Sequence, residues 1–263
     1  MEKRLRKSIR LGQNHLKSQK LVRGLVRASS ICASDTVIEI GPGHGIITNE
    51  LVRRAAKVVA VERDSALVNH LRERFRGVQN VSIIEGDFLK HHIQYSDHKI
   101  FANIPFNITA AVVRKILFSS PGLSEAYLII QKEPARKFSG HPQETLFSVL
   151  AKPCFELTIL RQLKRKDFDP VPAVDPVLLR IKRRPEALVR PADRGLYEDF
   201  VRSGFQAWKP TLRSAYKRVF TYKRWKIISS ELGFPLDATP TMLAFKQWIG
   251  LFRAYKRNKS LRM

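Results

Sequence analysis

The chain of 263 residues is 44% hydrophobic, which suits a globular protein with one large domain or a large domain and a small addition. It carries 48 Lys and Arg against 23 Asp and Glu, a formal net charge of +25. Folding does not require this excess, whereas a polyanionic partner relieves the self-repulsion that it causes. Nucleic acid is therefore the first candidate partner and an anionic membrane surface the second. No stretch approaches about 18 consecutive apolar residues, which excludes a membrane-spanning helix.

The N-terminus and the cysteines indicate a cytoplasmic protein. Residues 1–10 are basic and lead into Gly12 rather than into an apolar signal core, so we expect a short basic arm that contacts phosphates. Cys32 and Cys154 are far apart in apolar surroundings, as expected of reduced core residues. The histidines are scattered without the spacing of metal ligands, so no metal site is expected.

The first half of the chain alternates between predicted strands and helices. Apolar residues at helical spacing predict a helix over residues 16–28. Five β-branched runs follow, and we expect strands over residues 36–40, 57–61, 81–84, 100–102 and 126–130. Between them, helices are expected over residues 46–54, 65–75 and 109–118. This alternation is typical of a mainly parallel sheet that is covered on both faces.

The pattern changes after residue 150. Two further strands, over residues 155–160 and 177–181, flank a Pro-rich loop and are expected to pair antiparallel at one edge of the sheet. Residues 190–263 have no strand signal and predict three or four short helices rich in Arg, Lys and aromatic residues. We therefore expect an α/β domain with a mainly parallel seven-stranded sheet over residues 1–185, and a small all-helical domain over residues 186–263.

The strongest local signal is the run Glu39-Ile-Gly-Pro-Gly-His-Gly45, which lies between the first strand and the following helix. Glycine allows the backbone to turn sharply and to approach a ligand closely, and the N-terminus of the helix directs N–H groups at the same place. A Gly-rich turn can also be purely structural. The spacing Gly-x-Gly-x-Gly differs from the dinucleotide fingerprint Gly-x-Gly-x-x-Gly and favours S-adenosylmethionine over NAD.

Polar residues end the next three strands, at the sheet edge where ligands of such folds bind. Glu62 ends the second strand, where its carboxylate can accept hydrogen bonds from ribose hydroxyls. Asp87 follows the third strand, where it can accept from an adenine amino group, and Asn103 ends the fourth. Together with the glycine loop, these positions predict a binding site for a nucleoside-containing cofactor.

The run Asn103-Ile104-Pro105-Phe106 suits the methylation of an aromatic amine. The amino nitrogen of adenine is a poor nucleophile because its lone pair is delocalised into the ring. The Asn103 side-chain oxygen and the Ile104 carbonyl oxygen can accept its two N–H bonds, which draws the nitrogen toward a tetrahedral geometry. Pro105 would fix the turn, and Phe106 would stack on a flipped base, an interaction worth roughly 1–3 kcal/mol. The alternative is a turn that only ends a buried strand.

These motifs, in this order, resemble the rRNA adenine dimethyltransferase superfamily; they are Gly12-Gln-Asn14, Glu39 to Gly45, Glu62, Gly86-Asp87 and Asn103 to Thr109. Within it, the chain is similar to the erythromycin-resistance (Erm) methyltransferases, which act on an adenosine in the peptidyl-transferase region of 23S rRNA. The resemblance implies a Rossmann-like class I methyltransferase fold and S-adenosyl-L-methionine as the cofactor. It also implies a cytoplasmic monomer that methylates the N6 amine of an adenosine in 23S rRNA, giving macrolide-type resistance.

The resemblance also implies a role for individual residues. Those expected to bind the cofactor are Gln13, Asn14, Leu16, Gly41, Gly43, Gly45, Glu62, Arg63, Asp87, Phe88 and Asn103. Those expected to hold the target base are Asn103, Ile104, Pro105 and Phe106, with Phe168 as a second aromatic wall. For Phe168, the alternative is a residue that packs in the core. The chain departs from the family pattern at His15, where an aromatic residue is usual, and at Phe106, where many relatives have Tyr.

The RNA-binding surface is less defined, and the candidates are the basic arm, Lys132, Arg136, Lys137 and the basic C-terminal helices. The aromatic residues of those helices, among them Tyr216 and Trp225, can stack on bases or instead form the core of the small domain. Three alternatives to the Erm-like function stay open. They are a dimethyltransferase of small-subunit rRNA, a non-catalytic nucleic-acid-binding relative and an NAD-dependent enzyme.

Overall fold

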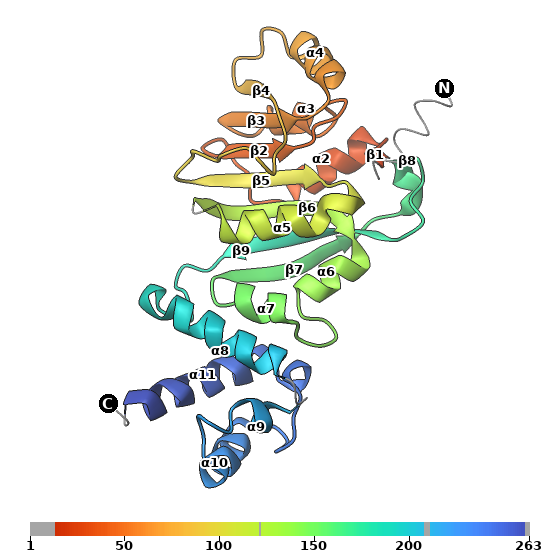
Figure 1. The fold of residues 1–263 in the computed structure, drawn as a ribbon. Coiled ribbons are helices and arrows are strands. Elements are labelled where there is room, and N and C mark those ends of the chain that lie inside the picture. Colours follow the sequence, from red (N-terminus) through yellow and green to blue (C-terminus); the bar gives the residue numbers. More distant parts are fainter. Residues whose placement is uncertain (1–13, 121, 208–210, 261–263) are drawn as a thin grey trace. The chain divides into compact units, whose positions relative to one another are not determined.

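The computed structural model describes residues 14–120, 122–207 and 211–260 (Figure 1). The chain divides into two compact units, one comprising residues 1–135 and 158–183 and the other residues 136–157 and 184–263. Residues 136–157, which the sequence alone placed in the α/β domain, therefore belong to the second unit. No helix among the described residues is both long and apolar enough to cross a membrane.

The first unit is built on a seven-stranded sheet with the strand order β4-β3-β2-β5-β6-β9-β7. Its strands are β2 (Thr36–Ile40), β3 (Lys57–Glu62), β4 (Val81–Glu85), β5 (His98–Asn103), β6 (Leu123–Gln131), β7 (Phe155–Gln162) and β9 (Pro176–Arg183). The division between the units falls within β7, whose first three residues belong to the second unit. Strands β2 to β6 pair in parallel, and β9 pairs antiparallel with β6. The predicted mainly parallel, seven-stranded Rossmann-like fold is confirmed.

Helices of the first unit pack on this sheet; they are α2 (Gln19–Arg27), α3 (Thr48–Leu51), α4 (Ser65–Arg74) and α5 (Thr109–Phe118). α3 and α4 contact β3, and α5 contacts β6 (Figure 1). The central strands are buried on both faces, and for example Val37 of β2 and Phe101 of β5 are fully buried. This two-sided burial explains why the strands read in the sequence as continuous apolar runs rather than as alternating ones.

A second, two-stranded sheet lies beside the start of α2 and was not expected from the sequence. β1 (His15–Leu16) pairs antiparallel with β8 (Phe168–Asp169), a pairing between segments about 150 residues apart. Because residues 15 and 16 are in a strand, α2 begins at Gln19 rather than at residue 16. The Ser18 hydroxyl caps the helix by accepting a hydrogen bond from the Leu21 N–H at 3.1 Å.

The second unit is helical around an aromatic core. Its helices are α7 (Leu146–Ala151), α8 (Arg194–Gln206), α9 (Leu212–Ala215), α10 (Tyr222–Leu232) and α11 (Phe245–Ser260), and α6 (Lys132–Phe138) enters it from the first unit. Tyr216 and Trp225 are buried in this core, and their polar atoms donate hydrogen bonds to the carbonyls of Phe200 and Leu236 at 2.7 and 3.0 Å. These two rings therefore form the core and are not available to stack on RNA bases.

The two cysteines lie apart and are not bonded to each other. Cys154 is partly buried, whereas Cys32 is exposed, so the expectation that both are core residues is wrong for Cys32. Cys32 lies in the turn between α2 and β2, where Asp35 accepts a hydrogen bond from its N–H. Turn residues of this kind stay at the surface because their backbone groups need polar partners.

Candidate active site

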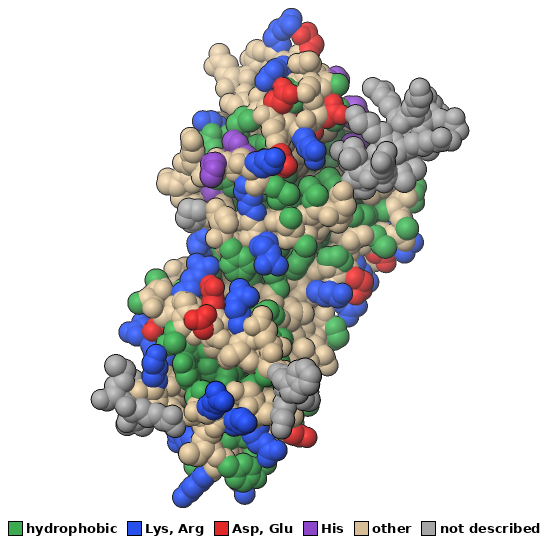
Figure 2. All heavy atoms as spheres, in the orientation of Figure 1, with side chains coloured by type: hydrophobic (Ala, Val, Ile, Leu, Met, Phe, Trp, Pro, Cys, Tyr) green, Lys and Arg blue, Asp and Glu red, His purple; other side chains and the backbone are tan. Residues whose placement is uncertain are grey.

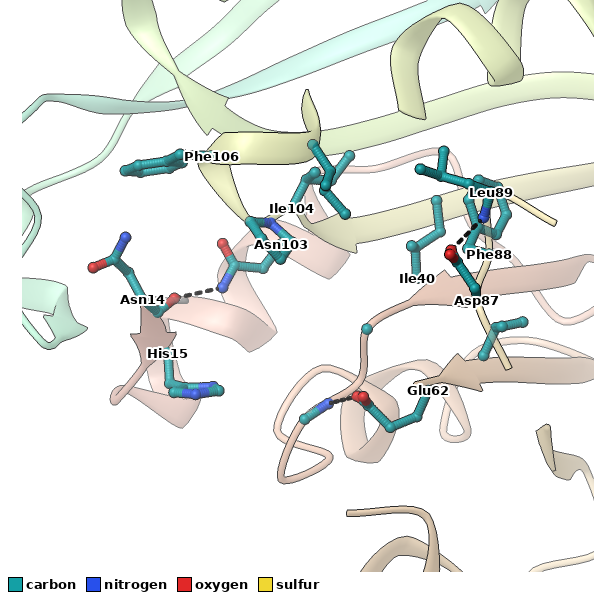
Figure 3. A pocket seen from close by; sticks show the side chains of 15 residues that line it. Asn14, His15, Ile40, Glu62, Asp87, Phe88, Leu89, Asn103, Ile104 and Phe106 are labelled. Atoms are coloured by element: carbon teal, nitrogen blue, oxygen red, sulfur yellow. Dashed lines mark hydrogen bonds between the residues drawn. The ribbon is translucent and has the colours of Figure 1, made fainter. Parts of the chain in front are cut away.

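A pocket opens at the carboxyl ends of β2, β3, β4 and β5, where parallel sheets of this kind bind ligands (Figure 3). The residues that line it are Asn14, His15, Ile40, Gly41, Gly43, Val61, Glu62, Asp87, Phe88, Leu89, Asn103, Ile104, Pro105, Phe106 and Ile108. The structure therefore brings the glycine loop, the acidic strand ends and the Asn103 segment together in one place. Segments that are up to about ninety residues apart in the chain meet here.

The glycine loop between β2 and α3 needs glycine at three positions. Gly41, Gly43 and Gly45 have φ angles of 64°, 59° and 79°, a left-handed conformation that disfavours side chains. Gly41 and Gly43 line the pocket. A Cβ on Gly45 would instead lie 2.8–2.9 Å from side-chain atoms of Phe75 and Leu71. Gly45 therefore lets the loop pack on α4. It does not line the pocket, contrary to the expectation that it binds the cofactor.

Glu62 ends β3 with its carboxylate held by three backbone N–H groups. One oxygen accepts from Gly43 at 3.1 Å, and the other accepts from Arg63 and Asp64 at 2.8 and 2.9 Å. The carboxylate is thus fixed against the glycine loop and still lines the pocket (Figure 3). Arg63 contributes its N–H to this arrangement, whereas its exposed side chain does not line the pocket.

The segment after β4 forms the wall of the pocket that faces Asn103 (Figure 3). The Asp87 carboxylate accepts a hydrogen bond from the Leu89 N–H at 2.9 Å, and Phe88 is buried at the pocket wall. Lys115 of α5 holds this segment in place, since its ammonium group donates to the carbonyls of Leu89 and His91 at 2.9 and 2.6 Å. The same ammonium lies 5.2 Å from the centre of the Phe88 ring.

The role of Lys115 was not predicted from the sequence, because no motif in the neighbouring residues distinguishes it from other lysines. Partial burial lowers the pKa of the Lys115 ammonium, and the nearby Asp87 carboxylate opposes this shift. α5 follows the Asn103 segment almost directly, so Lys115 joins the Asp87 segment to the helix that supports the other side of the pocket.

The Asn103 side chain is oriented by a contact with the N-terminal segment. Its Nδ2 group donates to the Asn14 carbonyl at 2.7 Å (Figure 3). Because Nδ2 is used in this way, the side-chain oxygen is the atom that stays available to accept hydrogen bonds in the pocket. The Ile104 N–H donates to the Ile129 carbonyl of β6 at 3.1 Å, which fixes the backbone that follows.

Pro105 and Phe106 begin a turn of 3-10 helix, η1 (Phe106–Ile108), that leads into α5. The Pro105 carbonyl accepts from the Ile108 N–H at 3.1 Å, which closes this turn. The Phe106 ring is partly exposed and lies on the same side of Asn103 as Asn14 (Figure 3). The predicted four-residue run therefore lines the pocket as a unit.

His15 lines the pocket where the family usually has an aromatic residue. Its ring lies against the glycine loop, since a Cβ on Gly43 would be 3.3 Å from Nδ1. The His15 and His44 rings are 5.6 Å apart, and His44 is 5.7 Å from His70. Burial lowers the pKa of His15, His44 lowers it further, and Glu62 and Asp169 oppose the shift. The flat, half-buried ring thus occupies the position of the missing aromatic residue.

Besides Gly45 and the Arg63 side chain, two more predicted site residues lie outside the pocket, and a third, Gln13, is outside the described residues. Phe168 is fully buried in the hydrophobic core, where it is the strand partner of Leu16, and it does not line the pocket. The prediction of a second aromatic wall is therefore wrong, and the core alternative fits. Leu16 is also buried, beneath a neighbouring hollow that His15 and Gly41 share. Gln13 is outside the part of the chain that the structure describes.

Comparison with known proteins agrees with these motifs. The family model described as "Ribosomal RNA adenine dimethylase" matches residues 4–256. An rRNA adenine N-6-methyltransferase of Bacteroides fragilis is 29% identical, over 92% of this chain and 91% of that protein. A ribosomal RNA small subunit methyltransferase A of Acaryochloris marina is 30% identical, over 92% of this chain and 94% of that protein.

The solved structures include a similar protein over nearly the whole chain. The crystal structure of the 23S rRNA methyltransferase ErmE has a TM-score of 0.86 and 29% sequence identity, covering 92% of this chain and all of that one. The similarity extends over both compact units, because it covers far more of the chain than the first unit alone. The chain belongs to the ribosomal RNA adenine dimethylase family.

Proposed function

We propose that the protein transfers a methyl group from S-adenosyl-L-methionine to the exocyclic N6 amine of an adenosine in 23S rRNA. The observation that carries this proposal is the orientation of Asn103, whose amide nitrogen is held by the Asn14 carbonyl. This contact leaves a hydrogen-bond acceptor in the pocket, as the methylation of an amine requires. A residue that only ended a strand would not need that orientation.

The pocket fits the proposed cofactor. Gly41 and Gly43 allow close approach of a ligand to the backbone. The Glu62 carboxylate, with three of its acceptor sites used by backbone N–H groups, has one left to accept a hydrogen bond from a ribose hydroxyl. Asp87, Phe88 and Leu89 would hold the cofactor adenine by an acidic group and apolar walls. S-Adenosylmethionine would supply an electrophilic methyl group bonded to a positively charged sulfur.

The chain would promote the reaction by position rather than by acid–base chemistry. The Asn103 side-chain oxygen and the Ile104 carbonyl would accept the two N–H bonds of the target amine, which exposes its lone pair. Phe106 would stack on the flipped adenine and hold its amino group in line. Held in this way, the nitrogen would accept the methyl group that S-adenosylmethionine supplies, with S-adenosylhomocysteine as the leaving group and the amine proton passing to water. Proximity and alignment of this kind can lower a barrier by roughly 7–11 kcal/mol.

The choice of 23S rRNA rests on the similarity to ErmE, which covers both units at a TM-score of 0.86. On this basis we also propose that the methylation gives macrolide-type resistance. A second candidate is an adenosine of small-subunit rRNA, because relatives named for the small subunit are equally similar in sequence, at 30–31% identity. Lys and Arg outnumber Asp and Glu on the face drawn in Figure 2, which suits either RNA.

The helical second unit is proposed to contact the RNA through exposed cations, among them Lys217, Arg218 and Lys226. We further propose that the enzyme acts as a monomer in the cytoplasm.

Labelled S-adenosylmethionine, offered with protein-free 23S rRNA and with immature small subunits, tests the proposed target. We expect label in 23S rRNA, at one adenosine that reverse transcriptase identifies as a stop. Label in the small subunit alone would assign the second candidate. No label in either RNA, with RNA binding intact, would instead indicate a non-catalytic relative.

A further inference from the structure

A basic groove lies along α2 in the first unit, apart from the residues that line the active-site pocket. Lys20 of α2 forms one wall, and Arg161 and Lys164, at the end of β7 and just after it, form the other. The floor between them is formed by Leu21, Gly24 and Leu163. A second hollow continues along α2 past Lys20 and Gly24 to Arg23 and Arg27.

Most of these cations have no acidic partner in the part of the chain that the structure describes. Lys20, Arg27, Arg161 and Lys164 are exposed, and none of them forms an ion pair with another described residue. Arg23 differs, because it pairs with Glu50 at 3.3 Å. The acidic residue of the first hollow, Asp167, already accepts a hydrogen bond from the Lys164 N–H at 3.3 Å. Cations on both walls of one groove repel each other, so this arrangement costs folding energy that a polyanion recovers.

The start of α2 adds to the positive potential. The first turn of this nine-residue helix contains no acidic residue, although acidic residues are the ones that stabilise a helix N-terminus. It contains Lys20 instead, which lies beside the positive end of the helix dipole. The absence of an acidic residue and the presence of Lys20 both make this helix end slightly less stable in the free protein, and both favour the binding of an anion there.

A short backbone connection joins the groove to the active site. The Lys17 N–H, one residue before the α2 cap, donates to the Asp167 carbonyl at 3.0 Å. The two segments continue as the antiparallel strands β1 and β8, in which His15 pairs with Asp169. His15 in turn lines the active-site pocket. The β1–β8 pair, which lies beside α2 (Figure 1), thus lies between the pocket and the groove along the chain. An RNA strand that presents an adenosine to Asn103 would continue over this pair into the groove.

We propose that this groove binds the phosphate backbone of the substrate RNA, in the nucleotides next to the target adenosine. The inference rests on the proposed function and adds to it a surface that would position the RNA. The nine residues of α2 extend over about 13 Å, which is enough for several successive phosphates. Because phosphate contacts do not depend on base sequence, the groove contributes affinity and register rather than choice of target.

Matched variants test the groove. The first is the triple variant Lys20→Gln, Arg161→Gln, Lys164→Gln, and the control is Arg53→Gln, Arg72→Gln, Arg76→Gln, which removes the same charge from exposed positions of the same unit. The probes are protein-free transcripts of 23S and 16S rRNA, and the measurement is the dissociation constant between about 50 and 200 mM salt. Binding of S-adenosylhomocysteine, followed by thermal shift, reports that the fold and the cofactor pocket are intact.

The groove variant is expected to lower the slope of log affinity against log salt by about 2, since each phosphate contact contributes roughly 0.7–0.9. At physiological salt its RNA affinity should fall between about ten- and fiftyfold, with the control changed far less. Equal losses in the two variants would overturn the proposal, because general charge would then explain both. Loss of binding to phosphatidylglycerol vesicles with unchanged RNA binding would assign the groove to a membrane and also overturn it.

The outcome can be separated from that of the proposed function. If the wild-type protein binds RNA through the groove but transfers no label, the groove proposal stands and the methyltransferase proposal fails. If label is transferred equally well at limiting RNA by the wild-type protein and by the groove variant, only the groove proposal fails.

Discussion

Glu39 provides a stability test that follows directly from the structure. It lies in β2, just before the glycine loop, and only 1% of its surface is exposed. Neither carboxyl oxygen has a hydrogen-bond partner of good geometry among the described residues, although the Thr48 hydroxyl and N–H are nearby donors. Burial raises the pKa of the Glu39 carboxyl to about 8, while the neighbouring Thr48 opposes the shift and Glu62 adds to it. The carboxyl is therefore protonated in the folded protein at neutral pH.

The size of the effect follows from the two pKa values. The raised value of about 8 exceeds the ordinary value of 4.5 by about 3.5 pH units. Between these two values the folded state keeps a proton that the unfolded state has lost, so the free energy of unfolding falls as the pH rises. At 1.36 kcal/mol for each unit, the loss amounts to roughly 5 kcal/mol once the pH has passed 8.

The variant Glu39→Gln removes this titration while it keeps the shape of the side chain. At pH 5 its free energy of unfolding should be close to that of the wild-type protein, and above pH 8 it should exceed it by several kcal/mol. Urea unfolding at a series of pH values measures both, and Glu73→Gln, which removes a carboxylate from an exposed position, serves as the control. A difference between Glu39→Gln and wild type that is constant with pH would refute the reasoning.

Three further predictions concern residues for which a role in the site was expected or is now seen. Because burial and His44 lower the pKa of His15, its folded form is neutral until the pH falls below the usual range of histidine. Protonation of His15 then costs stability and places a positive charge beside a cationic cofactor. The affinity for S-adenosylmethionine should therefore fall at acidic pH in the wild type but not in His15→Phe. Calorimetric titrations measure this, and equal pH profiles of the two proteins would contradict it. Lys115→Met should raise the KM for S-adenosylmethionine several-fold with kcat retained, because the Asp87 segment loses the cation that holds it. Lys115→Arg should bring the KM back in part, and a loss confined to kcat would argue against this role. Phe168→Ala should lower the free energy of unfolding by about 3–5 kcal/mol, as expected for a core residue. If Phe168→Ala instead kept the wild-type stability and selectively lost RNA methylation, Phe168 would have a role in holding the target base.

Local patterns were sufficient to predict most of the sheet. The strands expected at residues 36–40 and 57–61 are β2 (Thr36–Ile40) and β3 (Lys57–Glu62), because buried parallel strands leave compact β-branched runs in the sequence. The position of Asn103 at the end of β5 was predictable for the same reason, since its strand ends in the pocket with the others.

Features that depend on distant contacts could not be predicted in this way. The pairing of Leu16 with Phe168 joins segments that no local pattern connects, and it is what places Phe168 in the core. Lys115 reaches the Leu89 and His91 carbonyls from a helix that begins after the next strand, so its role appears only in the folded chain. Residues 136–157 similarly join the helical unit through packing that local sequence does not reveal.

The most direct test of the central claim is the single-turnover rate of methyl transfer for wild type and Asn103→Ala, with the product nucleoside identified after digestion. The wild-type protein is expected to yield adenosine methylated at N6. Asn103→Ala should bind S-adenosylmethionine with similar affinity and transfer methyl about 100-fold more slowly or worse, because a group that holds the amine in the transition state is lost. An unchanged rate in Asn103→Ala, or a methyl group on any other atom of the RNA, would contradict the proposed mechanism.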